Sequence, residues 1–146
     1  MRRFRFRLEK LLALRRYREK EWELKLAEIT GICINLEREI AHAESEKTRV
    51  LFKLTAGVGK VDMEILNFRE SYTARLNRRV AELVEELARR RLEQDEIREK
   101  YIKVSRDRKV LSKLKERLKA EYYKEQRMNE VKEIDDISNS KAKINI

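Results

Sequence analysis

Very few side chains in this sequence could do catalytic or metal chemistry. His42 is the single histidine and Cys33 the single cysteine, and no Ser/His/Asp or Cys/His grouping lies within plausible reach. HxxE and CxxC spacings do not occur in the sequence. We interpret His42 as a surface side chain and Cys33 as a small core residue, in a chain that suits a reducing compartment. We therefore expect no enzyme activity, no metal and no cofactor.

The stretch Gly57-Val58-Gly59-Lys60 looks faintly like a phosphate-binding loop. That motif needs glycine five residues before the Gly-Lys pair and Ser or Thr after it, whereas Leu54 and Val61 stand there. Two of the chain's three glycines lie here, and the chain has no proline. Because glycine costs about 1 kcal/mol in a helix interior, we expect one helix to end here and a second to start with Asp62 as its cap. The alternative is one bent, continuous helix.

The composition favours long helices over a thick globular core. The chain has 146 residues, of which 44% are charged and 7% aromatic. The basic start is followed by an apolar run that Glu9 and Lys10 interrupt and Arg15 closes, unlike a signal peptide. No stretch approaches 18 uninterrupted apolar residues. We therefore expect neither a signal peptide nor a membrane span.

Apolar residues recur at alternating spacings of three and four, the period of a coiled coil. Eleven of fourteen such positions are apolar in the first half and ten of fourteen in the second. The first series is Leu8, Leu12, Trp22, Leu26, Ile29, Cys33, Leu36, Ile40, Ala43, Val50 and Leu54. The second is Leu76, Val80, Leu83, Leu87, Ile97, Tyr101, Val104, Leu111, Leu118 and Tyr122. Polar residues that interrupt the two series include Arg15, Glu19, Lys47, Arg90, Gln94, Arg108 and Lys115.

The fold class predicted from these patterns is all-α, with two long helices in an antiparallel coiled-coil hairpin whose second helix is the longer. We expect a helix over residues 8–55, a turn over 56–62 and a helix over 63–134, forming a single domain over 1–134. Residues 135–146 lack periodicity and are expected to form a flexible tail.

The expected turn predicts a register for the hairpin. If residues 55 and 62 face each other, paired residue numbers sum to about 117, which places Leu87 opposite Ile29 and Leu83 opposite Cys33. The second helix then extends beyond the first from about residue 110. Its uncovered apolar residues would form a contact surface for another protein or for a second copy in a homo-oligomer. They are Leu111, Leu114, Leu118, Tyr122 and Tyr123.

Basic residues concentrate at the two ends of the chain. Residues 1–20 carry a net charge of +7 and residues 101–146 a net charge of +5, whereas 21–60 and 61–100 each carry −1. An antiparallel hairpin brings both positive segments to its open end. A run of charge is usually only a solvated helix face. Convergence of two distant segments favours a functional role.

The opening Phe4-Arg-Phe6-Arg-Leu8-Glu-Lys-Leu11-Leu12-Ala-Leu14-Arg15, with Glu19 after it, resembles the start of the FliJ family of flagellar export proteins. Tyr72-Thr-Ala-Arg-Leu76-Asn-Arg-Arg-Val80 is similar to that family's aromatic-x-x-x-Leu-x-x-x-Ile segment. Lys113-Leu-Lys-Glu-Arg-Leu118 resembles its charged C-terminal arm. The resemblance covers about residues 4–134.

The resemblance implies a cytoplasmic component of the flagellar type III export machine, at the cytoplasmic face of the inner membrane. Family members resemble the stalk of rotary ATPases, associate with the export ATPase hexamer, contact the transmembrane export gate and escort export chaperones. It implies a gate contact at Tyr72 and Leu76. The ATPase contact is expected in the region of the open end that contains Arg3, Arg5, Arg7, Lys109, Lys113, Lys115, Leu118 and Lys119.

Two other classes of protein fit parts of the sequence. A basic coiled coil could bind nucleic acid through phosphate contacts, which the pI of about 9.8 favours. No nucleic-acid motif accompanies that charge, so nucleic acid is not an expected partner. A scaffold segment would form long parallel dimers and would give Tyr72 no role.

Overall fold

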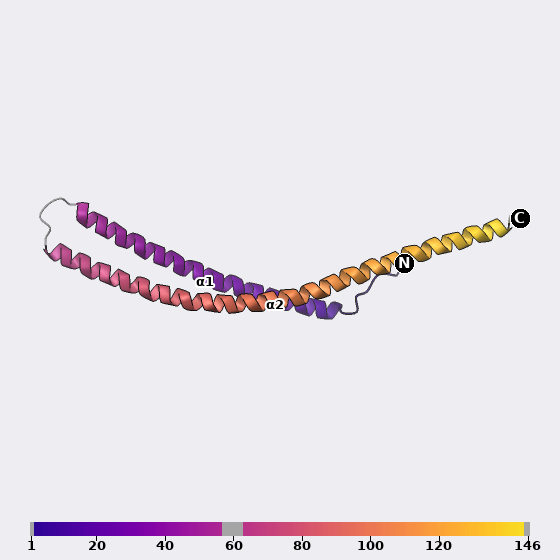
Figure 1. The fold of residues 1–146 in the computed structure, drawn as a ribbon, viewed down its shortest axis with the longest axis horizontal. Coiled ribbons are helices and arrows are strands. Elements are labelled where there is room, and N and C mark those ends of the chain that lie inside the picture. The colour runs from indigo at the N-terminus through magenta and orange to yellow at the C-terminus, as the bar shows by residue number, and fades with distance from the viewer. Residues whose placement is uncertain (1, 57–62, 145–146) are drawn as a thin grey trace. The chain divides into compact units, whose positions relative to one another are not determined.

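The computed structural model describes residues 2–56 and 63–144, which form two helices. Helix α1 spans Glu9–Ala56 and helix α2 spans Met63–Ile144, with 48 and 82 residues respectively. Figure 1 shows both helices, and the described residues contain no strand. The predicted all-α fold class, with an antiparallel hairpin and a longer second helix, is confirmed.

The sequence explains why α1 is continuous over its 48 residues. It contains no proline. Its one interior glycine, Gly31, faces open space, because no heavy atom beyond its neighbours in the helix lies within 4 Å of the place that a β-carbon would take there. The Glu9 amide donates a hydrogen bond to the Phe6 carbonyl at 3.2 Å where the helix begins, and the Glu9 carboxylate lies in the electropositive first turn. The predicted break at Gly57 and Gly59 and the cap at Asp62 lie outside the described residues.

The contacts divide the chain into two compact units, where one domain over residues 1–134 was expected. Unit 1 comprises Met1–Glu21 and Ile102–Ile146, and unit 2 comprises Trp22–Tyr101. Each unit contains a stretch of α1 and a stretch of α2 that run side by side in opposite directions (Figure 1).

Unit 2 has a narrow apolar core. Cys33 and Leu36 of α1 pack with Leu83 and Leu87 of α2, and all four side chains are buried. All four belong to the predicted apolar series, and Ile32 and Ile40 pack against them. Cys33 is thus the small core residue that the sequence indicated.

Unit 1 has its own core, and it corrects the prediction of an uncovered second helix from residue 110. Leu111 is buried against Phe6 and Leu12, and Leu114 and Leu118 pack on the same cluster. The segment that precedes α1 covers this part of α2. A non-helical chain advances about 3.3–3.6 Å per residue whereas a helix advances about 1.5 Å, so residues 2–8 reach further along α2 than a helix of that length would.

The predicted register holds in part of unit 2 and shifts by one heptad elsewhere. Glu39 pairs with Arg79 at 3.5 Å, and these residue numbers sum to 118, as predicted. Thr30 is hydrogen-bonded to Gln94 at 3.0 Å, whereas a sum of 117 would place Leu87 opposite it. Glu9 pairs with Lys115 at 2.8 Å, again seven residues further along α2 than predicted. A shift of one heptad leaves the same apolar residues facing the partner helix. The periodicity therefore identifies the seam but does not fix one register along its whole length.

Helix α2 extends to Ile144, ten residues beyond its predicted end at 134. The predicted flexible tail is thus helical over residues 135–144, and side chains from residue 127 to residue 144 are exposed. Asp, Ser and Asn lower helix propensity by only fractions of a kcal/mol each. No glycine or proline follows Gly59, so this stretch lacks the two residue types that stop a helix most strongly.

Candidate protein-interaction surfaces

The segment that precedes α1 is fixed to α2 by aromatic and polar contacts. The Tyr122 hydroxyl donates a hydrogen bond to the Arg2 carbonyl at 2.8 Å, and Gln126 donates one to the Tyr122 oxygen at 3.0 Å. The rings of Phe4 and Tyr122 lie 5.7 Å apart. Phe6 is buried in the unit 1 core. These contacts use the backbone and the phenylalanines, so the alternating arginines of the segment stay exposed.

These arginines share a shallow cavity of about 520 Å³ with lysines of α2. Its basic lining residues are Arg3, Arg5, Lys115 and Lys119. Glu9 also lines it and forms the ion pair with Lys115. One carboxylate thus faces four cations, so the cavity is suited to an acidic group of a partner.

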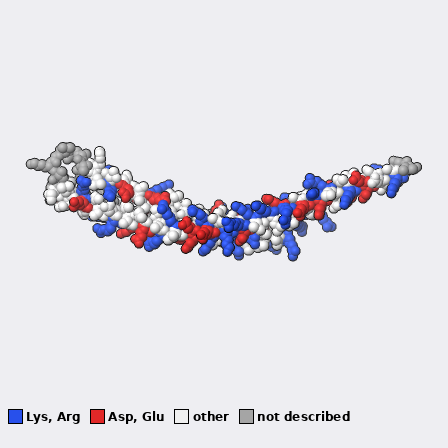
Figure 2. All heavy atoms as spheres, in the orientation of Figure 1, with Lys and Arg blue, Asp and Glu red and all other residues white. Residues whose placement is uncertain are grey.

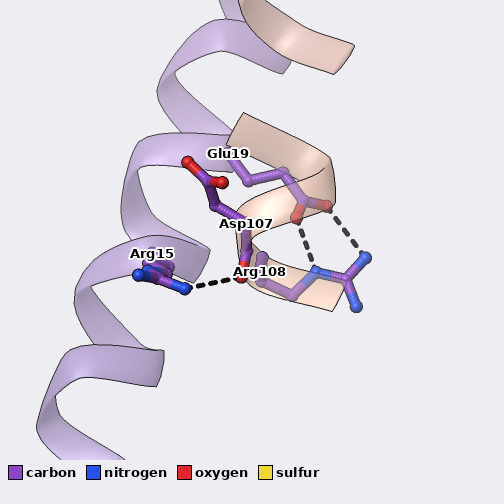
Figure 3. Close-up of polar contacts among 4 residues, drawn as sticks. All are labelled: Arg15, Glu19, Asp107 and Arg108. Atoms are coloured by element: carbon purple, nitrogen blue, oxygen red, sulfur yellow. Dashed lines mark hydrogen bonds and ion pairs between the residues drawn. The ribbon is translucent and has the colours of Figure 1, made fainter. Parts of the chain in front are cut away.

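A layer of charged side chains crosses the unit 1 seam next to the apolar core. Figure 3 shows Arg108 of α2 holding Glu19 of α1 through two parallel contacts, Nε to Oε2 at 2.6 Å and Nη2 to Oε1 at 3.3 Å. The side chains are only 27% and 18% exposed. Arg15 donates a hydrogen bond to the Asp107 carbonyl at 2.8 Å (Figure 3). Because the bidentate pair has a fixed geometry, it can specify how the helices align in this unit.

The net positive charge of the chain comes from unit 1. Its residues include 22 basic and 11 acidic side chains, a net charge of +11, whereas unit 2 has 15 basic and 16 acidic side chains, a net charge of −1. Residues 127–146 carry four of each sign, so the excess lies where α1 and its preceding segment accompany α2. Figure 2 shows lysine and arginine side chains crowded where the start of α1 lies beside α2.

Tyr72 and Leu76 lie together on α2 within unit 2, facing α1. Both are half-buried and line a shallow cavity of about 530 Å³ with Leu83 and Arg79 of α2. The α1 side of the cavity is formed by Glu39, His42, Ala43 and Glu46. Phe68, one turn earlier and exposed, stacks on Tyr72 with ring centroids 6.1 Å apart and an interplanar angle of 9°.

The structure brings together only part of the basic region predicted from the sequence. Arg3, Arg5, Lys115 and Lys119 line one cavity, whereas Arg7, Lys109 and Lys113 are exposed but do not line it. Lys115 is engaged with Glu9. Leu118 is half-buried against the unit 1 core, so it is not the uncovered apolar residue that was predicted.

Sequence reasoning missed three features of these surfaces. It did not pair Glu19 with Arg108, although both interrupt the apolar series with opposite charge. It did not anticipate that Tyr122 anchors the start of the chain, because the predicted register ended α1 too early along α2. It also passed over Phe68, four residues before Tyr72 and hence on the same helical face.

The described residues hold no group of three or more His, Cys, Asp or Glu side chains placed to bind a metal ion. Neither α1 nor α2, as far as the structure describes them, has a stretch long and apolar enough to cross a bilayer.

Comparison with protein-family models matches residues 4–143 to the family described as "Flagellar FliJ protein". Searches among curated proteins and among solved structures give no match. The family match covers nearly the whole chain and includes both units and the segment before α1. The chain therefore belongs to the FliJ family and is a flagellar export component.

Proposed function

We propose that this protein is a non-enzymatic stalk and adaptor of the flagellar export machine. In this role it associates with the export ATPase ring, links the ring to the transmembrane export gate and escorts export chaperones. It acts in the cytoplasm, as a peripheral component at the export apparatus. The observation that carries the proposal is the net charge of +11 in unit 1 beside a nearly neutral unit 2.

The ATPase contact is assigned to unit 1. A cavity that presents Arg3, Arg5 and Lys119 alongside aromatic side chains suits acidic groups on the inner surface of a ring. The net charge of the unit steers a ring of opposite charge and speeds encounter. Electrostatic attraction does not require closely fitting surfaces, which suits a stalk whose contacts change.

The gate contact is assigned to Tyr72 and Leu76 in unit 2. The Tyr72 side chain is half-buried and lines an open cavity. Its ring stacks on the exposed ring of Phe68. Interfaces often use a partly exposed tyrosine as an anchor because it buries a large area at little cost in conformational entropy. Assigning the two contacts to different units allows both partners to bind at once.

Co-purification from flagellated cells tests the ATPase assignment. A tagged chain is isolated before and after nuclease treatment, and the retained macromolecules are identified. The export ATPase should be retained in both samples. Retention of nucleic acid, with loss of the ATPase after nuclease treatment, would replace the stalk with a basic nucleic-acid-binding protein.

Tyr72→Ala tests the gate assignment, and Tyr101→Ala is the matched control. Both tyrosines are half-buried on the same helix and in the same unit. We expect Tyr72→Ala to weaken gate binding and flagellar assembly while helicity, melting temperature and ATPase binding stay near the parent values. Tyr101→Ala should leave gate binding unchanged. If Tyr72→Ala instead lowers the melting temperature by many degrees or binds the gate normally, Tyr72 is a seam residue.

A further inference from the structure

The first turns of α1 carry a second apolar stripe, which the seam with α2 does not use. Leu11, Leu14 and Tyr17 recur every three residues, and their exposed fractions rise along the helix through 38%, 45% and 64%. Each step of three residues falls about 60° short of a full circle. The stripe therefore starts at the flank of the seam and turns onto the side of α1 that faces away from α2.

Up to residue 20, this side of α1 presents cations and no carboxylate. Residues 1–20 contain two acidic side chains, Glu9 and Glu19. Both reach across to α2, where they pair with Lys115 at 2.8 Å and with Arg108 at 2.6 Å. The first carboxylate on this side is Glu21, about one turn beyond Tyr17 at the end of the unit.

Two exposed cations lie within the stripe and a third lies further round the helix. On a helical projection Lys10 falls between Leu14 and Tyr17 and Arg18 between Leu11 and Leu14, whereas Arg16 falls about 100° beyond Tyr17. Their long aliphatic stems can lie along the apolar residues while the charged groups reach outward. The sector thus combines three apolar side chains with the cations Lys10 and Arg18.

Directional hydrogen-bonding groups are missing from this surface. The first 29 residues contain no Ser, Thr, Asn or Gln, and Tyr17 is the one uncharged polar side chain of the stripe. A protein groove is usually matched by fixed polar groups at its rim. A fluid anionic surface needs only cations, apolar side chains and an aromatic residue at the level of the headgroups.

We propose that the outward face of α1 in unit 1 binds the surface of an anionic phospholipid bilayer. Leu11, Leu14 and Tyr17 enter the boundary between headgroups and acyl chains, while Lys10, Arg16 and Arg18 contact the lipid phosphates. The helix lies in the plane of the interface. With three apolar side chains the binding is reversible and depends strongly on charge and salt. This inference does not depend on the ATPase or the gate.

Vesicle co-sedimentation of the purified full chain tests the proposal. Vesicles of phosphatidylglycerol mixed with phosphatidylcholine are compared with vesicles of phosphatidylcholine alone. The parent should bind the anionic vesicles only, and binding should fall as salt is raised. Lys10→Gln with Arg16→Gln and Arg18→Gln should weaken binding by about a hundredfold, since each basic side chain near the surface contributes about fivefold.

Leu11→Ser with Leu14→Ser and Tyr17→Ser should weaken binding by about tenfold or more, since burial of even one such side chain can contribute that much. The matched control is Val131→Ser with Ile134→Ser and Ile137→Ser, which removes three exposed apolar residues from the neutral end of α2. It should bind like the parent. Circular dichroism of each variant checks that helicity is retained.

Three results would overturn the proposal. Equal binding to neutral vesicles would show that lipid charge is not recognised. Parent-like binding of the serine variant would show that charge alone drives association and that the stripe does not insert. Absence of vesicle binding by the parent, with loss of ATPase or nucleic-acid binding in the serine variant, would make the stripe a site for those partners.

Discussion

Units 1 and 2 are built from the same two helices and the same apolar series, yet they differ in charge and in the layers of their seams. Unit 2 has a core of Cys33, Leu36, Leu83 and Leu87 and a net charge of −1. Unit 1 joins a core of Phe6, Leu12 and Leu111 to the Glu19–Arg108 pair and carries a net charge of +11. A heptad pattern can therefore pair two helices in both units while the remaining positions differ enough to recognise different partners.

The two units also differ in the chain segments that form the two sides of their seams. In unit 2 both sides of the seam are helical. In unit 1 the α1 side continues as a non-helical segment held by Tyr122 and by the burial of Phe6. That segment brings its arginines beside the lysines of α2, which raises the density of positive charge beyond what two helices alone would give.

Truncation of a core leucine should have the largest effect on stability. Leu87→Ala removes a buried side chain from unit 2, and we expect it to lower the free energy of unfolding by about 2–5 kcal/mol. Val84→Ala, at a half-exposed position of the same helix, should cost much less. Urea denaturation measures both. Equal losses would mean that the seam of unit 2 is wrongly placed.

Phe6→Ala should have the next largest effect, confined to unit 1. It empties a buried position that holds the segment before α1. We expect a loss of about 1–3 kcal/mol, below a full core truncation because a terminal segment can detach locally. Hydrogen exchange should rise in residues 2–12 and stay unchanged in unit 2. Phe68→Ala, at an exposed phenylalanine, is the control, and similar exchange in the two variants would refute the anchoring role.

The coupling energy between Glu19 and Arg108 in unit 1 should exceed that of an exposed ion pair in unit 2. A double-mutant cycle with Glu19→Gln and Arg108→Gln should give a coupling energy of about 1–2 kcal/mol, because this bidentate pair is largely shielded from water. Glu39 and Arg79, 3.5 Å apart and more than half exposed, should give about 0.5 kcal/mol or less. Equal couplings would remove this distinction between the units.

Removal of residues 127–146 should have the smallest effect on stability. Side chains from 127 to 144 are exposed, so their loss uncovers no core residue of either unit. The melting temperature of the shortened chain, measured by circular dichroism, should change little. A large decrease would indicate that this part of α2 is buried in a homo-oligomer.

The sequence predicted the two helices and the seam residues because both depend on local information. Helix ends follow glycine and proline, and the apolar period marks one face of each helix. Cys33, Leu36, Leu83 and Leu87 were all placed correctly on the seam. The second helix end was misplaced because residues 135–144 contain weak helix formers but no residue that stops a helix.

The shift of the register away from a sum of 117 could not be predicted from the same information. In the predicted register Glu19 faces Arg98 and Arg108 faces Glu9, which are also opposite charges. The charged residues thus face opposite charges both in the predicted register and in the observed one, so they do not distinguish the two. The path of residues 2–8 was equally hidden, since periodicity describes helices only. Because of both errors, the sequence predicted Leu118 and Lys115 on an uncovered part of α2. In the structure both side chains are partly buried in unit 1.

The most direct test of the division of roles is the rate at which the chain associates with the export ATPase. One variant changes Lys109, Lys113 and Lys119 of unit 1 to glutamate, and its control changes Arg75, Arg78 and Arg89 of unit 2 to glutamate, all at exposed positions. Both alter net charge equally. We predict that the parent rate falls steeply with salt, that the unit 1 variant associates at least about tenfold more slowly at low salt, and that the control stays near the parent rate. Equal slowing of the two variants would show that only total charge matters and would contradict the assignment of ATPase recognition to unit 1.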